Sequence, residues 1–390
     1  MYPVFERDKT TWEKKIGFIN NTGKLVIGFD RSPKRIEGVF EFHEGRAAMY
    51  VTKEKVDPYS LYYAMGYLDE TGKVVIEPRF DEARDFSEGL AYVTSKEFRG
   101  FIDRDGKAVI KIDGEAKDFH EGLAAVKASG TSQWGGWGYI DRSGKWVIKP
   151  QYELADDFSE GLAQVMVDRK LGFINKKGEM IIPPRFGARP VNYVWLRQFD
   201  TSRFSEGLAA VMLGDLYGYI NKKGNFVIPP QFSHAQEFSE GLAWVVTGDE
   251  TTYAEKKAGW IDKTGRWVVT SVNGRPFSSG LPEFMTYKND SFDWRYSEGL
   301  VPFIAYEGER ASWGYMDRKG RVVIKPIIVL YEAYSVSVAG TCCESKVVIE
   351  PRGHTVGPFL GGVARVDFYS GREKDYGYIN KNGHFIWRSW

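Results

Sequence analysis

The sequence predicts an all-β protein built from tandem repeats. Its 390 residues include 43 Gly, 12 Trp, 22 Tyr and 25 Phe, a composition typical of many short strands joined by tight turns. The hydrophobic fraction of 43% is enough for a buried core. A short motif recurs along the chain, so its spacing, rather than an average domain length, indicates how the protein is organised.

The first repeated motif is Gly, aromatic, aliphatic, Asp or Asn, two polar residues, Gly. The shortest offset between copies, from Gly66 to Gly100, is 34 residues, and the longer offsets are this unit plus insertions. The nine copies begin at Gly17, Gly66, Gly100, Gly138, Gly172, Gly218, Gly259, Gly314 and Gly377.

This motif predicts a β-hairpin, shown most clearly by residues 218–228. The runs 218–220 and 226–228 are β-branched or aromatic and suit strands. Between them, the Asn221 side chain accepts bonds from backbone amides, and Gly224 takes the left-handed conformation that closes the loop. Pro229-Pro230 is expected to end the second strand, because proline cannot donate to a β-ladder.

A second motif, an aromatic anchor followed by Ser-Glu-Gly and an apolar strand, occurs eight times. We expect the anchors to be buried, and each unit to form a three-stranded antiparallel meander. Seven copies keep the Glu-Gly pair; because an active site needs one constellation rather than seven, we expect these Glu side chains to bond free backbone amides at the turn. The anchors are Phe42, Phe86, Phe119, Phe158, Phe204, Phe238, Tyr296 and Phe359.

Together the two motifs resemble the bacterial WG repeat family, also called KWG repeats. The pattern matches almost residue for residue over 66–93, 138–165 and 218–245, and the resemblance extends from residue 17 to 387. The Trp-Gly pair that names the family stands at Trp137-Gly138 and Trp313-Gly314. The resemblance implies a β-repeat architecture and, as in most members, no established catalytic activity. It therefore supplies no catalytic residues.

A meander every 34 to 45 residues or so is typical of a β-propeller blade, so we expect one array over residues 1–390 with about eight propeller-like blades. An open β-solenoid is the alternative, because both ends of the chain carry the same first hairpin. Residues 346–352 copy residues 73–79, which predicts a degenerate unit within 327–366.

Composition excludes several classes of protein. With 53 Lys plus Arg against 52 Asp plus Glu, no net basic field favours nucleic-acid binding. No window is apolar over the ~18 residues of a membrane span. Cys342 and Cys343 are adjacent and cannot link distant parts of a fold, and no signal peptide is evident. We therefore expect a cytoplasmic protein.

The usual constellations of catalysis are weak, so we predict no catalytic, cofactor-binding or metal-binding residues and no cofactor. His43 and His120 replace the Ser of the second motif, as parts of a structural turn. Residues 103–106, Asp-Arg-Asp-Gly, superficially suggest a calcium loop but form the hairpin turn of a repeat and lack the later ligands.

Function is expected in the insertions between repeats, since loops carry binding sites more often than strands do. Aromatic residues beside arginine are typical anchors of protein interfaces, and exposed Trp rings also stack on sugars; the structural alternative is that these rings close the insertions over the core. The candidate residues are Trp134, Trp137, Tyr193, Trp195, Arg197, Tyr287 and Trp294.

We therefore expect a non-enzymatic scaffold that binds a protein through its insertion loops. The alternatives are a glycan or cell-envelope ligand binder that uses exposed Trp and Tyr, and an enzyme with one site at the axis of a propeller.

Overall fold

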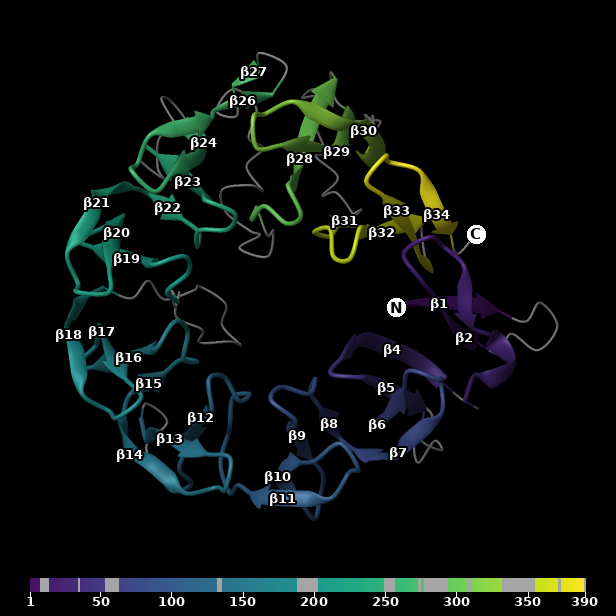
Figure 1. The fold of residues 1–390 in the computed structure, drawn as a ribbon, viewed down its shortest axis with the longest axis horizontal. Helices are drawn as coiled ribbons and strands as arrows, with labels where there is room; N and C mark the ends of the chain where they lie inside the picture. Colours follow the sequence, from purple (N-terminus) through teal and green to yellow (C-terminus); the bar gives the residue numbers. More distant parts are fainter. Residues whose placement is uncertain are drawn as a thin grey trace, which may run out of the picture. The chain divides into compact units, whose positions relative to one another are not determined.

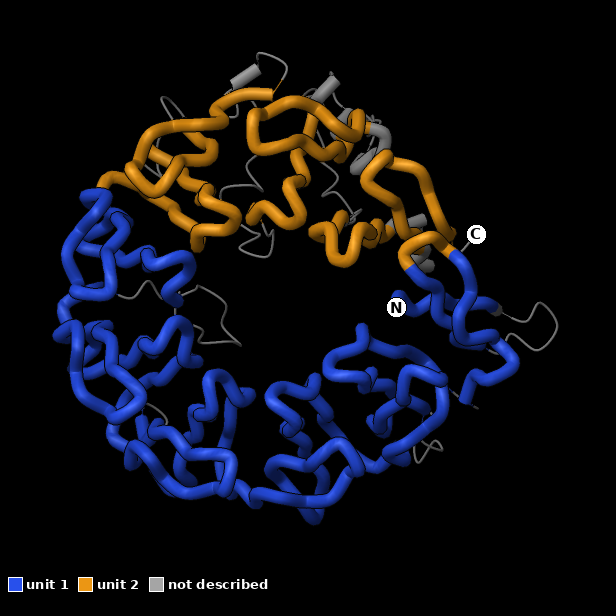
Figure 2. The backbone as a smooth tube through the Cα atoms, in the orientation of Figure 1, with its two compact units in different colours: residues 1–20, 24–230 blue, residues 21–23, 231–390 orange. Residues whose placement is uncertain are grey.

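The computed structural model describes residues 1–7, 14–33, 36–52, 63–131, 135–187, 203–248, 257–272, 275–276, 294–307, 310–331, 355–370 and 373–388. These residues form two compact units, which Figure 2 shows in different colours. Unit 1 comprises Met1–Asn20 and Lys24–Pro230, and unit 2 comprises Asn21–Gly23 and Gln231–Trp390.

Unit 1 is a succession of small antiparallel sheets in chain order (Figure 1). A 3-10 turn, η1 (Phe29–Arg31), follows the first sheet. The sheets are β1 (Tyr2–Arg7), β2 (Lys14–Ile19) and β3 (Leu25–Ile27); β4 (Ile36–His43), β5 (Arg46–Thr52), β6 (Tyr63–Asp69) and β7 (Val74–Phe80); β8 (Glu82–Ala83), β9 (Ala91–Thr94), β10 (Arg99–Ile102) and β11 (Ala108–Lys111); β12 (Leu123–Lys127), β13 (Trp137–Asp141) and β14 (Trp146–Tyr152); β15 (Leu154–Ala155), β16 (Leu162–Val167), β17 (Lys170–Asn175) and β18 (Met180–Phe186); and β19 (Leu208–Leu213), β20 (Leu216–Asn221) and β21 (Phe226–Phe232).

Unit 2 repeats this plan. Its sheets are β22 (His234–Ala235), β23 (Leu242–Thr247), β24 (Lys257–Asp262) and β25 (Trp267–Val269); β26 (Ser271–Val272) and β27 (Arg275–Pro276); β28 (Leu300–Glu307), β29 (Arg310–Asp317) and β30 (Val322–Tyr331); and β31 (Thr355–Val356), β32 (Val363–Ser370), β33 (Glu373–Asn380) and β34 (Phe385–Arg388). Most of the predicted degenerate unit, including the 346–352 copy, lies outside the described residues.

The all-β prediction is confirmed: the described residues contain small antiparallel sheets and no α-helix. Each sheet is offset from the sequence repeat, because the strand after a Glu-Gly turn pairs with the next Gly-aromatic strand, as Val126 does with Gly138. Several sheets also contain a fourth strand of two residues, such as β15 beside β16, whereas the predicted meander has three strands. Whether the array closes into a propeller or stays open remains a prediction.

The prediction that Pro229-Pro230 ends the second strand is wrong, because β21 runs through both prolines to Phe232. β14 continues through Pro150 to Tyr152, which pairs with Trp137, and the ladder register shifts between Trp137 and Tyr139. β14 is the outermost strand of its sheet, so the missing N–H of Pro150 breaks no bond to a further strand.

Apolar side chains fill the space between successive sheets. Seven of the eight anchors are buried, and Phe42, which is half-buried, packs on Phe18 with ring centroids 4.9 Å apart. Phe158 meets the ring of Tyr139 edge-to-face at 4.9 Å, and the Tyr139 hydroxyl donates a 2.6 Å bond to the carbonyl of Asp156. The anchor and the Gly-aromatic strand therefore form one buried core. In the described part of the chain no helix is long and apolar enough to span a membrane.

Candidate functional site

The Glu-Gly pairs form tight turns with left-handed backbone at both residues. At Glu88 and Gly89, φ is 52° and 81°, and Ser87 N donates to Leu90 O at 2.9 Å, the geometry of a two-residue type I′ hairpin. Glycine adopts this conformation freely, whereas for glutamate it costs roughly 1 kcal/mol. A glutamate recurs in this strained position seven times, so its side chain should have a compensating partner.

That partner is the Glu-Gly turn of the next repeat. Glu44 accepts bonds of 2.8 Å from the amides of both Glu88 and Gly89. Glu88 in turn accepts a 2.9 Å bond from the Gly122 amide. Within each unit the same contact continues at Glu121–Gly161, Glu160–Gly207, Glu240–Gly299 and Glu298–Gly362. We call this series the Glu-Gly ladder. The prediction that these carboxylates bond turn amides is confirmed, but the amides belong to the neighbouring repeat.

A cation from a hairpin turn completes most steps of the ladder. Arg104 Nη2 lies 2.8 Å from Glu44 Oε2, and Lys222 Nζ lies 3.1 Å from Glu160 Oε2. Burial alone would raise the pKa of Glu44, but the Arg104 guanidinium and the Gly89 and Glu88 amides lower it below its usual value. Three further pairs have the same form: Lys176–Glu121, Arg318–Glu240 and Lys381–Glu298.

The residue before the Glu of a ladder step also reaches the next repeat. Ser87 Oγ donates a 2.6 Å bond to the carbonyl of the next anchor, Phe119. The same contact joins Ser159 to Phe204, Ser239 to Tyr296 and Ser297 to Phe359. His43 and His120, which replace this Ser, lie instead near an Asp of the next repeat: His43 Nε2 is 3.4 Å from Asp85, and His120 Nε2 is 3.6 Å from Asp157.

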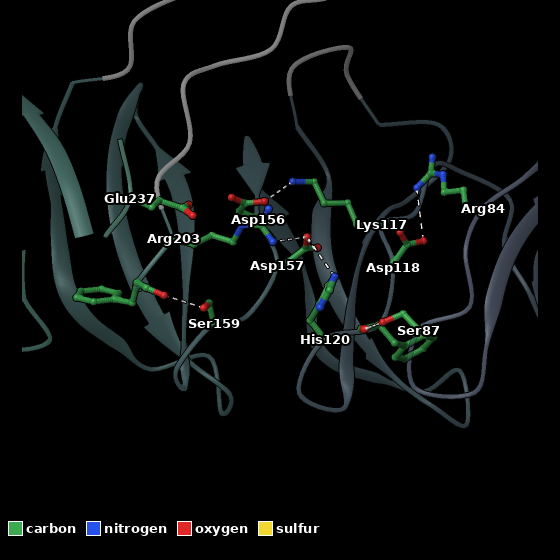
Figure 3. A network of polar contacts seen from close by, with 12 residues as sticks. Arg84, Ser87, Lys117, Asp118, His120, Asp156, Asp157, Ser159, Arg203 and Glu237 are labelled. Carbon is green, nitrogen blue, oxygen red and sulfur yellow. Dashed lines mark hydrogen bonds and ion pairs between the residues drawn. The ribbon is translucent and has the colours of Figure 1, made fainter. Parts of the chain in front are cut away.

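The residues immediately before the anchors form a second polar network, shown in Figure 3. Lys117 Nζ lies 2.6 Å from Asp156 Oδ1, and Arg84 Nη1 lies 3.9 Å from Asp118 Oδ1. Asp157 lies between His120 and Arg203, with Arg203 Nη1 at 3.5 Å (Figure 3).

The pKa values of the carboxyl groups in this network are shifted in opposite directions. Burial disfavours the charge of Asp156, but Lys117 outweighs it and lowers the pKa of Asp156. Burial raises the pKa of Asp118 and of Asp157, since Arg84, His120 and Arg203 compensate only in part. The Oδ1 atoms of Asp118 and Asp157 are buried and accept no hydrogen bond from any residue in the described ranges. Such carboxyl groups cost stability while they are ionised.

The acidic motif at residues 103–106 has the geometry of a hairpin turn. Asp103 Oδ1 accepts the amides of Asp105 at 3.1 Å and Lys107 at 2.9 Å, so residues 103–106 form the predicted hairpin turn. Among the residues that the structure describes, no group of three or more His, Cys, Asp and Glu side chains is arranged to hold a metal ion.

Two of the predicted interaction residues can be placed. Trp294 is 8% exposed and stacks on Trp244 with ring centroids 5.5 Å apart. This burial is what the alternative expects, in which the ring packs on the core instead of facing a partner. Trp137 begins β13 and is half-buried, packing at the side of the core around Phe158. The remaining candidates lie outside the described residues: Trp134, Tyr193, Trp195, Arg197 and Tyr287.

Sequence reasoning missed both networks between repeats. A signal was available for the ladder, since Lys or Arg follows the Asp or Asn of the hairpin turn in seven of the nine copies, as at Arg104 and Lys222. For Asp118 and Asp157 the sequence showed only acids before two anchors; their burial depends on the packing of the next repeat.

The fold and the ladder define a class: an array of small antiparallel β-sheets generated by one repeat and joined by contacts between equivalent turns. The model of the WG containing repeat matches residues 65–96, 100–131, 137–170, 172–188, 217–250 and 313–329, so these stretches of the chain are WG repeats. The resemblance seen in the sequence is thereby confirmed.

Solved structures resemble this chain in fold. A crystal structure of a eukaryotic initiation factor is 11% identical, with 82% of this chain and 84% of that chain covered and a TM-score of 0.50. The β-propeller domain of the Trilobed protease from Pyrococcus furiosus is 10% identical, with 67% and 90% covered and a TM-score of 0.33. The tricorn protease is 11% identical, with 98% and 42% covered and a TM-score of 0.34. Comparison with curated proteins gave no match.

Proposed function

We propose that this protein is a non-enzymatic scaffold that binds another macromolecule, in the first place a protein, through loops inserted between its repeats. The observation that carries the proposal is that the Glu-Gly ladder keeps its geometry whatever length of chain separates its partners. The separation is 34 residues for Glu88–Gly122, 47 for Glu160–Gly207 and 64 for Glu298–Gly362, and the bonds stay between 2.9 and 3.2 Å.

Extra residues therefore enter without disturbing the contacts that hold neighbouring repeats. Two such insertions lie between β12 and β13 and between β23 and β24, where the flanking pairs Lys127–Trp137 and Thr247–Lys257 keep the register of the paired strands. A regular framework that carries variable loops suits a binding protein, because recognition can change while stability does not. The adjacent Cys342 and Cys343 fit a reducing compartment such as the cytoplasm.

A loop replacement tests the proposal. Residues 129–135 are exchanged for Gly-Asp, the turn that joins Leu213 to Leu216 in the equivalent place, where Ala128 and Gly136 pair. We expect an unchanged melting temperature and a severalfold loss of at least one partner, measured by quantitative capture from the native organism. The matched variant exchanges 248–256 for the same dipeptide. If neither variant changes the set of captured proteins, binding through these loops is refuted.

A further inference from the structure

The outermost strand of the sheet β11-β10-β9-β8 presents backbone groups along its edge (Figure 1). In β11, Ile110 pairs with Phe101, and the Ile112 amide donates a 2.8 Å bond to the carbonyl of Arg99. Alternate residues of an antiparallel strand bond to the same neighbour, so the amide and carbonyl of Lys111 point away from β10. Among the described residues no strand pairs with this side of β11.

The outer strands of other sheets in unit 1 are interrupted at the point where β11 is regular. The ladders of β7, β14 and β18 shift register just after a buried Ile, whereas β11 stays in register from Ile110 to Lys111. Pro183 in β18 and Pro229 in β21 stand in the place of Lys111 and leave no amide to donate. Bulges and prolines protect exposed edges, so β11 is less protected than these strands.

An exposed tryptophan lies beside this edge. Trp146, at the start of β14, is 41% exposed, and the other Trp side chains of the described residues are buried or half-buried. The hairpin turn before it packs on β11, since a Cβ on Gly144 would come within 2.9 Å of Ile110 Cγ2. Exposed Trp side chains are frequent anchors of protein interfaces.

The exposure of Trp146 follows from the residue that ends β11. Phe226, the equivalent of Trp146, packs edge-to-face on Phe186 with ring centroids 6.0 Å apart. Phe186 pairs with the residue before the Gly-aromatic motif, and Ile112 holds that place in β11. Trp146 therefore has no aromatic ring of the preceding sheet at this position.

We propose that β11 binds an extended segment of a partner protein, which adds an antiparallel strand to this sheet. A backbone edge identifies its occupant as a polypeptide, because a second backbone supplies the matching donors and acceptors. The inference rests on the proposed function as a protein-binding scaffold and adds a site outside the insertion loops.

The pleat of the added strand specifies its side chains. Successive side chains of a strand face opposite sides of the sheet. The side chain directly opposite Lys111 shares the face of the exposed lysine, where an acidic residue pairs favourably. The next side chain shares the face of Ile112, on the side of Trp146, where an apolar residue fits. We therefore infer a segment that alternates acidic and apolar residues.

A second copy of this chain fits the edge less well. β11 has four residues, about 13 Å at roughly 3.3 Å per residue. Stable interfaces bury about 800 Å² on each partner, which two copies meeting at so short an edge would not reach. A narrow extended segment can lie along β11 and cover Trp146 as well.

The test uses capped hexapeptides that alternate Val and Glu, added to the full chain and followed by NMR. We expect saturable binding and at least tenfold slower hydrogen exchange at the Lys111 amide. In an antiparallel pair the amides of the Glu residues face Lys111, so N-methylation of these amides should weaken binding at least tenfold. N-methylation of the Val amides, which point away from β11, should change binding less than about twofold.

Two variants locate the site. Lys111→Pro removes the outward amide, as Pro183 does in β18, and should weaken binding at least tenfold. Lys111→Ala keeps this amide and is the matched control, which should lose only the pairing with Glu, a smaller effect. Trp146→Ala should weaken binding severalfold. Should Lys111→Pro not fold, the N-methylated peptides on the wild-type chain decide.

Several results would overturn the inference: no saturable binding, equal weakening by both N-methylations, or binding that Lys111→Pro leaves unchanged. A dimer of the free chain that Lys111→Pro dissociates, seen by sedimentation velocity, would also overturn it, because a second copy would then occupy the edge. None of these results depends on the insertion loops, so the loop-replacement test of the scaffold stands independently.

Discussion

The Glu160 carboxylate accepts hydrogen bonds of 3.0 and 3.2 Å from the amide of Gly207, although 47 residues separate the two in the chain. Glu160 itself lies in the left-handed region, with φ at 53°. Asparagine or glycine would adopt this backbone more readily, but neither could extend a carboxylate to the next turn. The recurrence of glutamate in these turns is thus explained by a contact between repeats rather than by the turn itself.

Removing one carboxylate of the ladder should destabilise the protein modestly. Glu160→Gln loses the charge that both Gly207 N and Lys222 Nζ face, and because the side chain is partly exposed we expect a loss of about 1 kcal/mol. Urea unfolding measures the difference. Glu115→Gln, an exposed acid outside the ladder, is the matched control. Equal stabilities of the two variants would argue against the contact.

The ladder should weaken in acid. The pKa of Glu44 is lowered in the folded protein, so its contribution is complete above the unfolded value of about 4.3 and is lost as the pH falls through the folded pKa. We expect Glu44→Gln to melt below the wild type at pH 7, and the gap to close as the pH approaches 3. A gap that is constant with pH would show that ionisation of Glu44 plays no part.

Asp156 and Asp118, which lie in successive repeats, should change the stability of the protein in opposite directions when each is replaced by Asn. Asp156 has a lowered pKa and pairs with Lys117, so Asp156→Asn should destabilise the protein at pH 7 by about 2 kcal/mol. Asp118 has a raised pKa and a buried oxygen that accepts no hydrogen bond from the part of the chain that the structure describes, so Asp118→Asn should stabilise the protein.

The pH dependence separates these two effects. The advantage of Asp118→Asn is full above the folded pKa of Asp118 and disappears below the unfolded value of about 3.9, because the wild type is then protonated as well. The deficit of Asp156→Asn persists down to the unfolded value and fades below it. Thermal melts between pH 3 and 8 give both curves, and two variants that shift in the same direction at pH 7 would contradict this assignment.

Burial of the anchor Phe158 predicts a larger loss of stability when this residue is truncated. Phe158 is 3% exposed and packs on Tyr139, so Phe158→Ala should cost about 3–5 kcal/mol through lost burial and a cavity. Val147→Ala, on the outer strand of the preceding sheet and 44% exposed, should change the free energy of unfolding by less than about 0.5 kcal/mol. A melting shift near zero for Phe158→Ala would refute burial of the anchor.

Local structure was predictable from the sequence because it depends on local chemistry. Asp69 Oδ1 accepts the amides of Thr71 at 2.9 Å and Lys73 at 3.1 Å, and Gly72 takes φ of 81°, as the hairpin motif indicates. The extension of β14 through Pro150 was not predictable from the motif, because it depends on β14 being the outermost strand.

Contacts between repeats could not be predicted from the sequence, for a different reason. The Lys or Arg of the hairpin turns, such as Lys222, is visible in the sequence as a possible partner for a carboxylate. It does not show that the Glu160 carboxylate accepts the Gly207 amide, because that requires the Gly207 turn to lie beside Glu160.

Amide hydrogen exchange at the ladder glycines tests the central claim most directly, namely that each Glu carboxylate holds the turn of the next repeat. We predict slow exchange at Gly161 and Gly207 in the wild type. In Glu160→Gln, exchange at Gly207 should accelerate at least tenfold, while Gly161, whose partner is Glu121, stays protected. Rapid exchange of Gly207 in the wild type, or exchange unchanged by Glu160→Gln, would contradict the ladder.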